Sequence, residues 1–89
     1  MTAEQKVKIN NETGLHARPA SQLVNKAGKF VSKIEIMTED KEVNAKSIMG
    51  IMSLGLGKGD EIILRAEGDD AEAAVESLVE FIEVELLKH

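Results

Sequence analysis

The sequence of 89 residues contains no cysteine, tryptophan or tyrosine, and it has one proline and two histidines. Without cysteine the chain can form neither a disulfide framework nor a thiolate metal site. The histidines lie far apart in the sequence, which argues against a histidine-based metal site as well. Aromatic residues make up only 2%, so the chain lacks the stacking surfaces that bind single-stranded nucleic acids. We therefore expect no metal and no cofactor.

Positive charge is also scarce, because 11 Lys and Arg face 16 Asp and Glu, which gives a net charge of −5. A generic nucleic-acid binder carries a basic excess, so we expect no direct nucleic-acid partner. The chain has no long apolar run and nothing resembling a signal peptide, so we expect a cytoplasmic protein without membrane insertion. Its length and its 43% hydrophobic residues suit one small domain that spans residues 1–89.

Changes in hydrophobic periodicity predict the order strand, helix, strand, strand, helix, strand, helix. The expected strands lie around residues 6–10, 32–38, 43–45 and 61–67, and the expected helices lie around residues 19–27, 47–54 and 69–82. Asp69 would begin the last helix in a capping box with Glu72. The helices each need an apolar surface to pack on, and the alternating strands provide one apolar face of a sheet. This combination implies a two-layer α+β sandwich. The order of the strands in the sheet does not follow from these patterns.

The stretch GLHARPA, residues 14–20, carries the residues best suited to chemistry. Pro19 lacks an N–H and suits the first turn of a helix, which places His16 or Ala17 at the N-cap. The unpaired N–H groups of a helix start bind anions, and the Arg18 guanidinium matches phosphate oxygens. The pattern indicates that His16 can accept and hold a phosphoryl group. The alternative interpretation is that His16 only caps the helix and Arg18 is solvated.

The segment SIMGIMSLG, residues 47–55, follows a serine that suits a helix N-cap. Its large apolar residues point to too many sides of a short helix to be buried together. We expect Ile51 to face the core, and we expect an exposed patch of three residues: Ile48, Met49 and Met52. Such a patch marks a protein interface, and methionines suit partners of different shape. The alternative is that a wider face is buried, with methionine filling the gaps.

Two motifs resemble the signatures of the phosphocarrier protein HPr of the bacterial sugar phosphotransferase system. GLHARPA resembles that family's active-site signature, and AKSIMGIMSLGLGKGDEI, residues 45–62, resembles the second signature, around a regulatory serine. The second motif is more similar to HPr of Gram-positive bacteria than to enteric HPr. The resemblance runs in register from about Lys6 to the C-terminus. It implies an open-faced β-sandwich, βαββαβα, with a four-stranded antiparallel sheet in the order 1-4-2-3 covered by three helices.

The resemblance also implies a phosphoryl carrier that is transiently phosphorylated on histidine and is not a free-standing catalyst. His16 would accept the phosphoryl group on Nδ1 from phospho-Enzyme I and donate it to the IIA component of a sugar permease. Arg18 would compensate the phosphate charge, and the backbone N–H of Ala17 would complete the site. No cofactor takes part.

Regulation and docking are implied in the same way. Ser47 would be phosphorylated by HPr kinase/phosphorylase. In carbon catabolite repression, this phosphorylation would create a surface that binds a repressor of transcription. Ile48, Met49 and Met52 would dock Enzyme I and IIA proteins, and a monomer is expected. The alternatives are an HPr-like regulator, a carrier of a nitrogen or dihydroxyacetone branch, and a non-catalytic interaction module. Some HPr-like regulators lack the histidine that His16 supplies here.

Overall fold

The computed structural model describes residues 1–12 and 14–88. Its elements follow the order predicted from the sequence, with a short 3-10 helix, η1, after the last helix. They are β1 (Thr2–Lys8), α1 (Ala17–Ala27), β2 (Lys33–Met37), β3 (Glu42–Asn44), α2 (Ile48–Ser53), β4 (Glu61–Glu67), α3 (Ala71–Glu83) and η1 (Glu85–Lys88).

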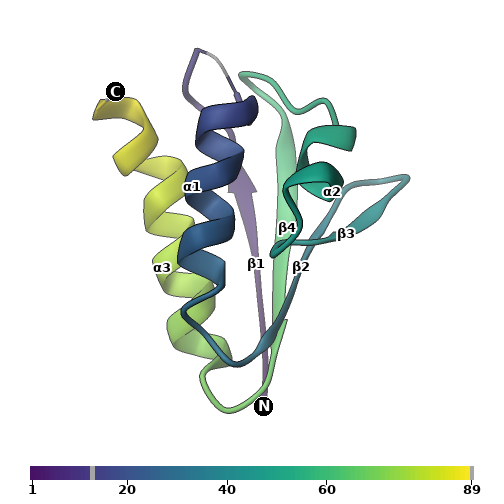
Figure 1. Ribbon diagram of the computed structural model, residues 1–89, viewed down its shortest axis with the longest axis vertical. Helices are drawn as coiled ribbons and strands as arrows, with labels where there is room; N and C mark the ends of the chain where they lie inside the picture. Colours follow the sequence, from purple (N-terminus) through teal and green to yellow (C-terminus); the bar gives the residue numbers. More distant parts are fainter. Residues whose placement is uncertain (13, 89) are drawn as a thin grey trace.

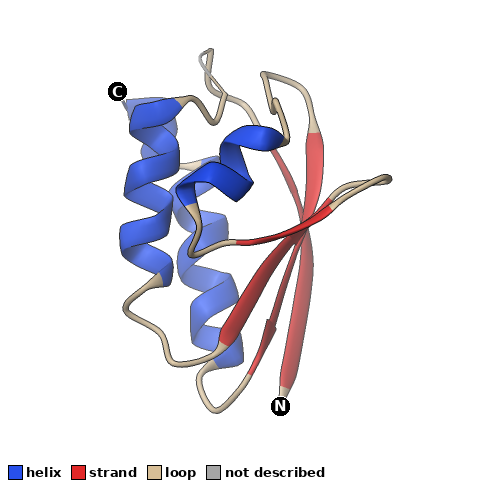
Figure 2. Ribbon diagram, turned by 45° about the vertical axis from the view of Figure 1, so that its right-hand side comes forward, coloured by secondary structure: helices blue, strands red, loops and turns tan. Residues whose placement is uncertain are grey.

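The four strands form one antiparallel sheet in the order β1-β4-β2-β3. The helices cover one face of this sheet and the other face is open, as Figure 2 shows from the side. This confirms the open-faced two-layer sandwich and the strand order that the resemblance implied. A sheet with one face on the core and one face in water gives the alternation from which the strands were predicted.

Strand β1 is longer toward the N-terminus than the sequence predicted. It begins at Thr2, opposite Glu67, and ends at Lys8, opposite Glu61, so its length follows that of β4. The first residues of β1 do not alternate between apolar and polar side chains. Most of these residues are exposed, because β1 lies at the edge of the sheet. Ile9 lies beyond the strand but is fully buried.

The core lies between the sheet and the helices, and it contains the side chains that the periodicity placed inside. From the strands and the residue after β1 come Val7, Ile9, Ile34, Ile36, Ile62, Leu64 and Ala66, and from the helices come Ala20, Leu23, Ala27, Ile51, Ala71, Ala74, Val75, Leu78 and Ile82. Full burial of one such leucine or isoleucine contributes about 1.5–3 kcal/mol.

The two long helices start at opposite ends of the molecule. In Figure 1, α1 runs downward from the upper end and α3 runs upward from the lower end, where the N-terminus also lies. The upper end brings together the loop before α1, the loop between α2 and β4, and the C-terminal η1. The candidate residues around His16 belong to this upper end.

The start of α3 differs from the prediction by one residue. The N-cap is Asp70 and not Asp69, and no side chain caps the helix, so the expected box with Glu72 does not form. The Asp70 carboxylate instead accepts hydrogen bonds from the backbone N–H groups of Val31 and Ser32 and from the Ser32 hydroxyl. A tertiary contact therefore takes the carboxylate that a local cap would have used.

Candidate functional site

His16 is the N-cap residue of α1, one of the two positions that the sequence allowed for that cap. Its backbone is extended, with φ −74° and ψ −172°, and its carbonyl accepts the N–H of Ala20 at 2.9 Å. The side chain is exposed and makes no capping hydrogen bond. The imidazole is therefore held at the helix start by the backbone alone and is open to a reaction partner.

The first turn of α1 presents unpaired hydrogen-bond donors. Within the described residues, the backbone N–H groups of Ala17 and Arg18 have no partner, and Pro19 has no N–H. The turn also holds no acidic side chain. Free N–H groups and the positive end of the helix dipole both favour an anion at this place. The local structure therefore suits a phosphoryl group on the neighbouring histidine.

Gly14 fixes the loop that carries His16. Its φ of +61° lies in the left-handed region, and a Cβ at this position would collide with the Leu56 carbonyl oxygen. Leu15, which is buried, donates its N–H to that same oxygen at 3.2 Å. The Asn11 side chain closes the turn by donating to the Gly14 carbonyl at 2.9 Å. The loop before His16 is thus pressed against the loop that follows α2.

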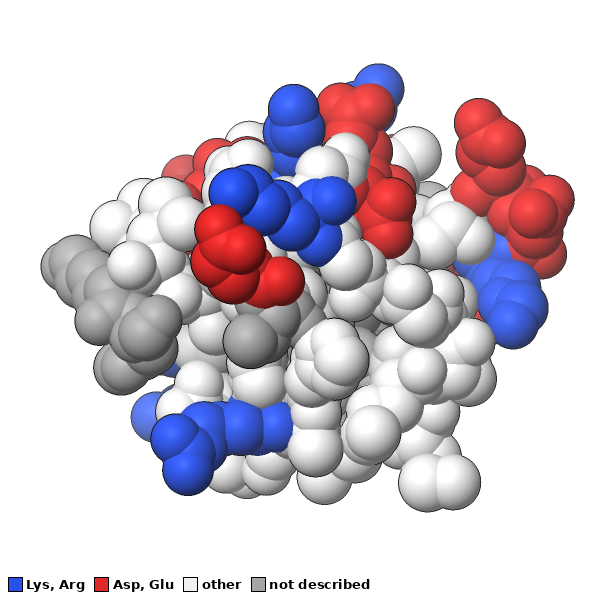
Figure 3. Space-filling model, turned by 90° about the horizontal axis from the view of Figure 1, so that it is seen from above, with Lys and Arg blue, Asp and Glu red and all other residues white. Residues whose placement is uncertain are grey.

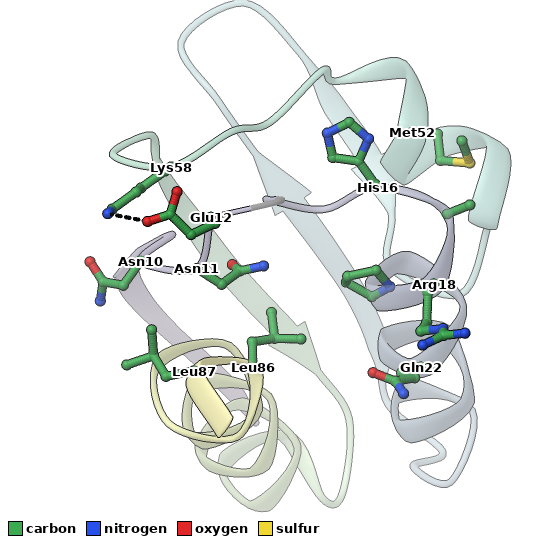
Figure 4. Close-up of a pocket in the computed structure, with 12 residues that line it drawn as sticks. Asn10, Asn11, Glu12, His16, Arg18, Gln22, Met52, Lys58, Leu86 and Leu87 are labelled. Atoms are coloured by element: carbon green, nitrogen blue, oxygen red, sulfur yellow. Dashed lines mark hydrogen bonds and ion pairs between the residues drawn. The ribbon is translucent and has the colours of Figure 1, made fainter. Parts of the chain in front are cut away.

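A groove of about 830 Å³ opens beside His16 (Figure 4). On the side away from α1, Leu86 and Leu87 of η1 form an apolar wall. Lys58 and Glu12 line the same side and form an ion pair of 3.0 Å between Nζ and Oε1. Both of these charged groups are well exposed, so the pair contributes little to stability.

Arg18 is exposed and lines the groove from α1. Figure 4 shows its side chain beside Gln22, one helical turn further on, and not against the His16 ring. Within the described residues, no ion pair holds the guanidinium. Its long side chain would therefore have to turn toward the histidine before it could compensate a charge there.

The exposure predicted for α2 is confirmed. Exposed fractions are 40% for Ile48, 80% for Met49 and 44% for Met52, whereas Ile51 is fully buried. Met52 also lines the groove beside His16. Figure 3 views the upper end from above, and the lower half of that view is the side formed by α1 and α2. This side shows uncharged and basic side chains, while acidic ones gather elsewhere in the view. Docking through this patch stays a prediction.

Ser47 is the N-cap of α2, as predicted. Its Oγ accepts the N–H of Gly50 at 3.1 Å, and the residue is half-buried. The neighbouring Lys46 is engaged elsewhere, because its ammonium donates to the Phe30 carbonyl at 2.8 Å. The hydroxyl lies at the edge of the exposed patch, where an added phosphate would change the charge of that surface.

Sequence reasoning missed the contacts that shape the groove. It quoted Gly14 within a motif but did not assign it the approach to Leu56, and it did not include Leu86, Leu87 or the Glu12–Lys58 pair. The glycine of the NETG turn was a sequence signal for the positive φ of Gly14. No sequence signal indicated the apolar wall formed by η1.

Residues 1–12 and 14–88 contain no candidate membrane span and no candidate metal cluster. No helix there combines the length and the apolar character needed to cross a membrane. No group of three or more potential ligands from histidine, cysteine, aspartate and glutamate in that part of the chain could hold a metal ion.

A protein-family model described as "PTS HPr component phosphorylation site" matches residues 3–84. The chain belongs to the HPr family. The match includes the loop of His16, Arg18 and the start of α2, whereas Leu86 and Leu87 of the groove wall lie beyond it.

Individual relatives carry two different names. The HPr-like protein Crh of Halalkalibacterium halodurans is 50% identical over 82 residues, which cover 92% of this chain and 98% of that protein. The crystal structure of HPr-C-His from Thermoanaerobacter tengcongensis is 52% identical, with a TM-score of 0.91 and 94% of each chain covered. An HPr dimer from the same organism is 54% identical, with a TM-score of 0.75 and coverage of 90% and 92%. The family is thus shared by proteins named HPr and Crh, and the expected monomer stays a prediction.

Proposed function

We propose that this protein is a phosphoryl carrier of the sugar phosphotransferase system, phosphorylated on Nδ1 of His16. Phospho-Enzyme I donates the group, and the IIA components of sugar permeases receive it. The observation that supports this most is the exposed His16 ring at a helix start where the N–H groups of Ala17 and Arg18 are unpaired. A histidine that served only as a cap would use its side chain to bond those groups.

The transfer needs little from the protein beyond position and charge. The Nδ1 lone pair attacks phosphorus, the bond from phosphorus to the donor breaks, and a phosphorus–nitrogen bond forms. The Ala17 and Arg18 amides then donate to phosphoryl oxygens, and the Arg18 guanidinium turns in from the groove wall to share the negative charge. Such preorganised donors stabilise the transition state at low reorganisation cost. Gly14 keeps the loop in place during both transfers.

In this proposal the exposed patch of Ile48, Met49 and Met52 docks Enzyme I and IIA proteins beside the reacting histidine. Ser47 is the regulatory site, phosphorylated by HPr kinase/phosphorylase. Phosphate adds roughly −1.5 to −2 charge, which a helix N-terminus accepts but which opposes acidic groups on a docking partner. Phospho-Ser47 thereby weakens docking of Enzyme I and offers a surface to a catabolite-control repressor. We place this cycle in the cytoplasm.

A second candidate is a regulator without a carrier role, like the relatives named Crh. The identities of 50% and 43% to two such proteins favour it. Phosphorylation of Ser47 would then be the only modification, and His16 would be idle. The presence of the histidine, on an exposed and donor-rich helix start, favours the carrier.

Purified protein incubated with phosphoenolpyruvate and Enzyme I separates the two candidates. We expect acid-labile phosphate on the wild type and none on His16→Ala, with circular dichroism showing the same fold for both. A wild type that takes up no acid-labile phosphate, but is phosphorylated on Ser47 by HPr kinase/phosphorylase and ATP, would support the regulator. Acid-labile phosphate on His16→Ala would show that another residue accepts the group.

A further inference from the structure

The methionines of α2 stand out among the groups that a mild oxidant can reach. The chain has four methionines and no cysteine, so no thiol competes for a peroxide. Met49 is 80% exposed and Met52 is 44% exposed. They are three residues apart on one helix, so they share a face, and Met52 also lines the groove of His16. Oxidisable sulfur thus lies within the exposed patch itself.

We propose that Met49 and Met52 are oxidation sites through which hydroperoxides reversibly weaken docking to phosphoryl-transfer partners. This inference rests on the proposed carrier function. In the reaction the thioether sulfur attacks the terminal oxygen of hydrogen peroxide, the O–O bond breaks and an S–O bond forms. Sulfur loses two electrons, the peroxide is reduced, and the departing hydroxide leaves as water with the proton of the transferred oxygen. Methionine sulfoxide reductases reverse the change with two electrons from a dithiol, which is oxidised to a disulfide, and the oxygen leaves as water.

The effect follows from what a sulfoxide does to an apolar surface. It replaces a flexible apolar side chain with a polar, chiral one whose oxygen is hydrated. A partner that covers the patch must strip this water without offering a matched donor, which weakens association. We expect the KM for the partner to rise about tenfold, which corresponds to about 1.4 kcal/mol. The kcat should change little, because the chemistry at His16 is untouched.

The other two methionines provide internal controls. Met1 is 72% exposed but lies at the N-terminus, at the end of the molecule opposite the groove (Figure 1). Met37 is half-buried in β2, and since Ile36 beside it faces the core, Met37 faces the open side of the sheet. Sulfoxide at either position leaves the patch of α2 intact.

The test is a titration of the full chain with hydrogen peroxide, in which mass spectrometry of peptides gives the oxidised positions. Steady-state transfer from Enzyme I gives KM and kcat for each sample. Four proteins are compared: wild type, Met49→Leu with Met52→Leu, Met52→Leu alone, and Met37→Leu as the matched control. Each is compared with its own untreated form, so that any effect of the substitution on basal docking cancels.

We expect Met49 and Met52 to oxidise before Met37, and KM to rise with their oxidation in the wild type and in Met37→Leu. The double variant should not respond, and methionine sulfoxide reductase should restore the wild type. An unchanged KM with both α2 methionines oxidised, or an equal rise in the double variant, would overturn the inference and leave the carrier function standing. A failure of the untreated wild type to accept phosphate would instead remove the proposed function, and the inference with it.

Discussion

The N-termini of α1 and α3 lie at opposite ends of the molecule, and the side chains of their cap residues are used differently. At α1 the cap residue His16 leaves its ring exposed and the N–H groups of Ala17 and Arg18 unpaired. At α3 the cap residue Asp70 has its carboxylate fully engaged by Val31 and Ser32 from the loop before β2. We call the start of α3 closed and that of α1 open in this sense only: the Asp70 side chain is held by a tertiary contact, whereas the His16 side chain is exposed. Neither side chain bonds the first N–H groups of its own helix.

We interpret the start of α3 as structural and the start of α1, with its exposed histidine, as the proposed functional one. Exposed N–H groups at a helix start stay open to water or to an anion, and at α1 they lie beside the exposed His16 side chain. The hydrogen bond from the Ser32 side chain, followed by the one from the Val31 backbone, holds the pKa of Asp70 below its ordinary value of 3.8. Within the described part of the chain, no comparable set of bonds engages the His16 side chain at the open start. The three predictions below test this contrast, from the largest effect on phosphoryl transfer to none.

Among these changes, loss of the Arg18 charge should lower the rate of phosphoryl transfer most. Arg18→Ala should keep the fold and His16 but slow phosphoryl transfer about 100-fold, the scale of losing one charge-stabilising donor. Arg18→Lys should recover part of the rate, because a point charge cannot reproduce the guanidinium fork. Lys29→Ala, beyond the far end of α1, removes the same charge as a control. Rapid-quench transfer from Enzyme I measures all four proteins, and equal rates would show that Arg18 is idle.

A charge at Ser47 should act on docking and not on chemistry. Ser47→Asp should keep the melting temperature, since aspartate also caps helices, and should raise the KM for Enzyme I about tenfold with a nearly unchanged kcat. Ser47→Ala separates the two roles of the residue. It loses the bond to Gly50 and about 0.5–2 kcal/mol of stability, but its KM should stay at the wild-type value. A lower kcat with an unchanged KM for Ser47→Asp would mean that the α2 start acts on the His16 loop directly.

The closed start should affect stability alone. Because the pKa of Asp70 is lowered in the folded protein, its stabilising contribution is present above the unfolded value and is lost as pH falls through the folded value. Asp70→Asn should therefore melt several degrees below wild type at pH 7, and the gap should shrink below about pH 4. Asp69→Asn, at the exposed neighbour, is the control. Phosphoryl transfer at pH 7 should be the same for all three proteins, and a gap in melting temperature that does not shrink at all as the pH falls below about 4 would contradict the linkage.

The regular parts of the fold could be predicted because they depend on local periodicity. Alternation placed Ile34, Ile36, Ile62 and Leu64 in the core, and all four are buried. Local patterns also placed the cap of α2 at Ser47 and narrowed the cap of α1 to His16 or Ala17. The exposure of the α2 methionines followed from counting apolar residues against the width of a short helix.

The remaining features could not be predicted because they join residues far apart in the sequence. The N-cap is Asp70 and not the predicted Asp69, and its carboxylate bonds Ser32, 38 residues earlier. The collision that requires glycine at position 14 involves the carbonyl of Leu56. The position of the Arg18 side chain beside the groove depends on packing, and no spacing encodes it. Local patterns determine where the helices and strands lie in the sequence, whereas contacts between loops determine the geometry of the candidate site.

The most direct test of the central claim is to follow backbone amides by NMR while the protein is phosphorylated with phosphoenolpyruvate and Enzyme I. If the open start of α1 holds the phosphoryl group of His16, the amide resonances of Ala17 and Arg18 should move furthest, and those of Val31 and Ser32 at the closed start of α3 should stay in place. Phosphorylation that leaves Ala17 and Arg18 no more shifted than Val31 and Ser32 would contradict the account.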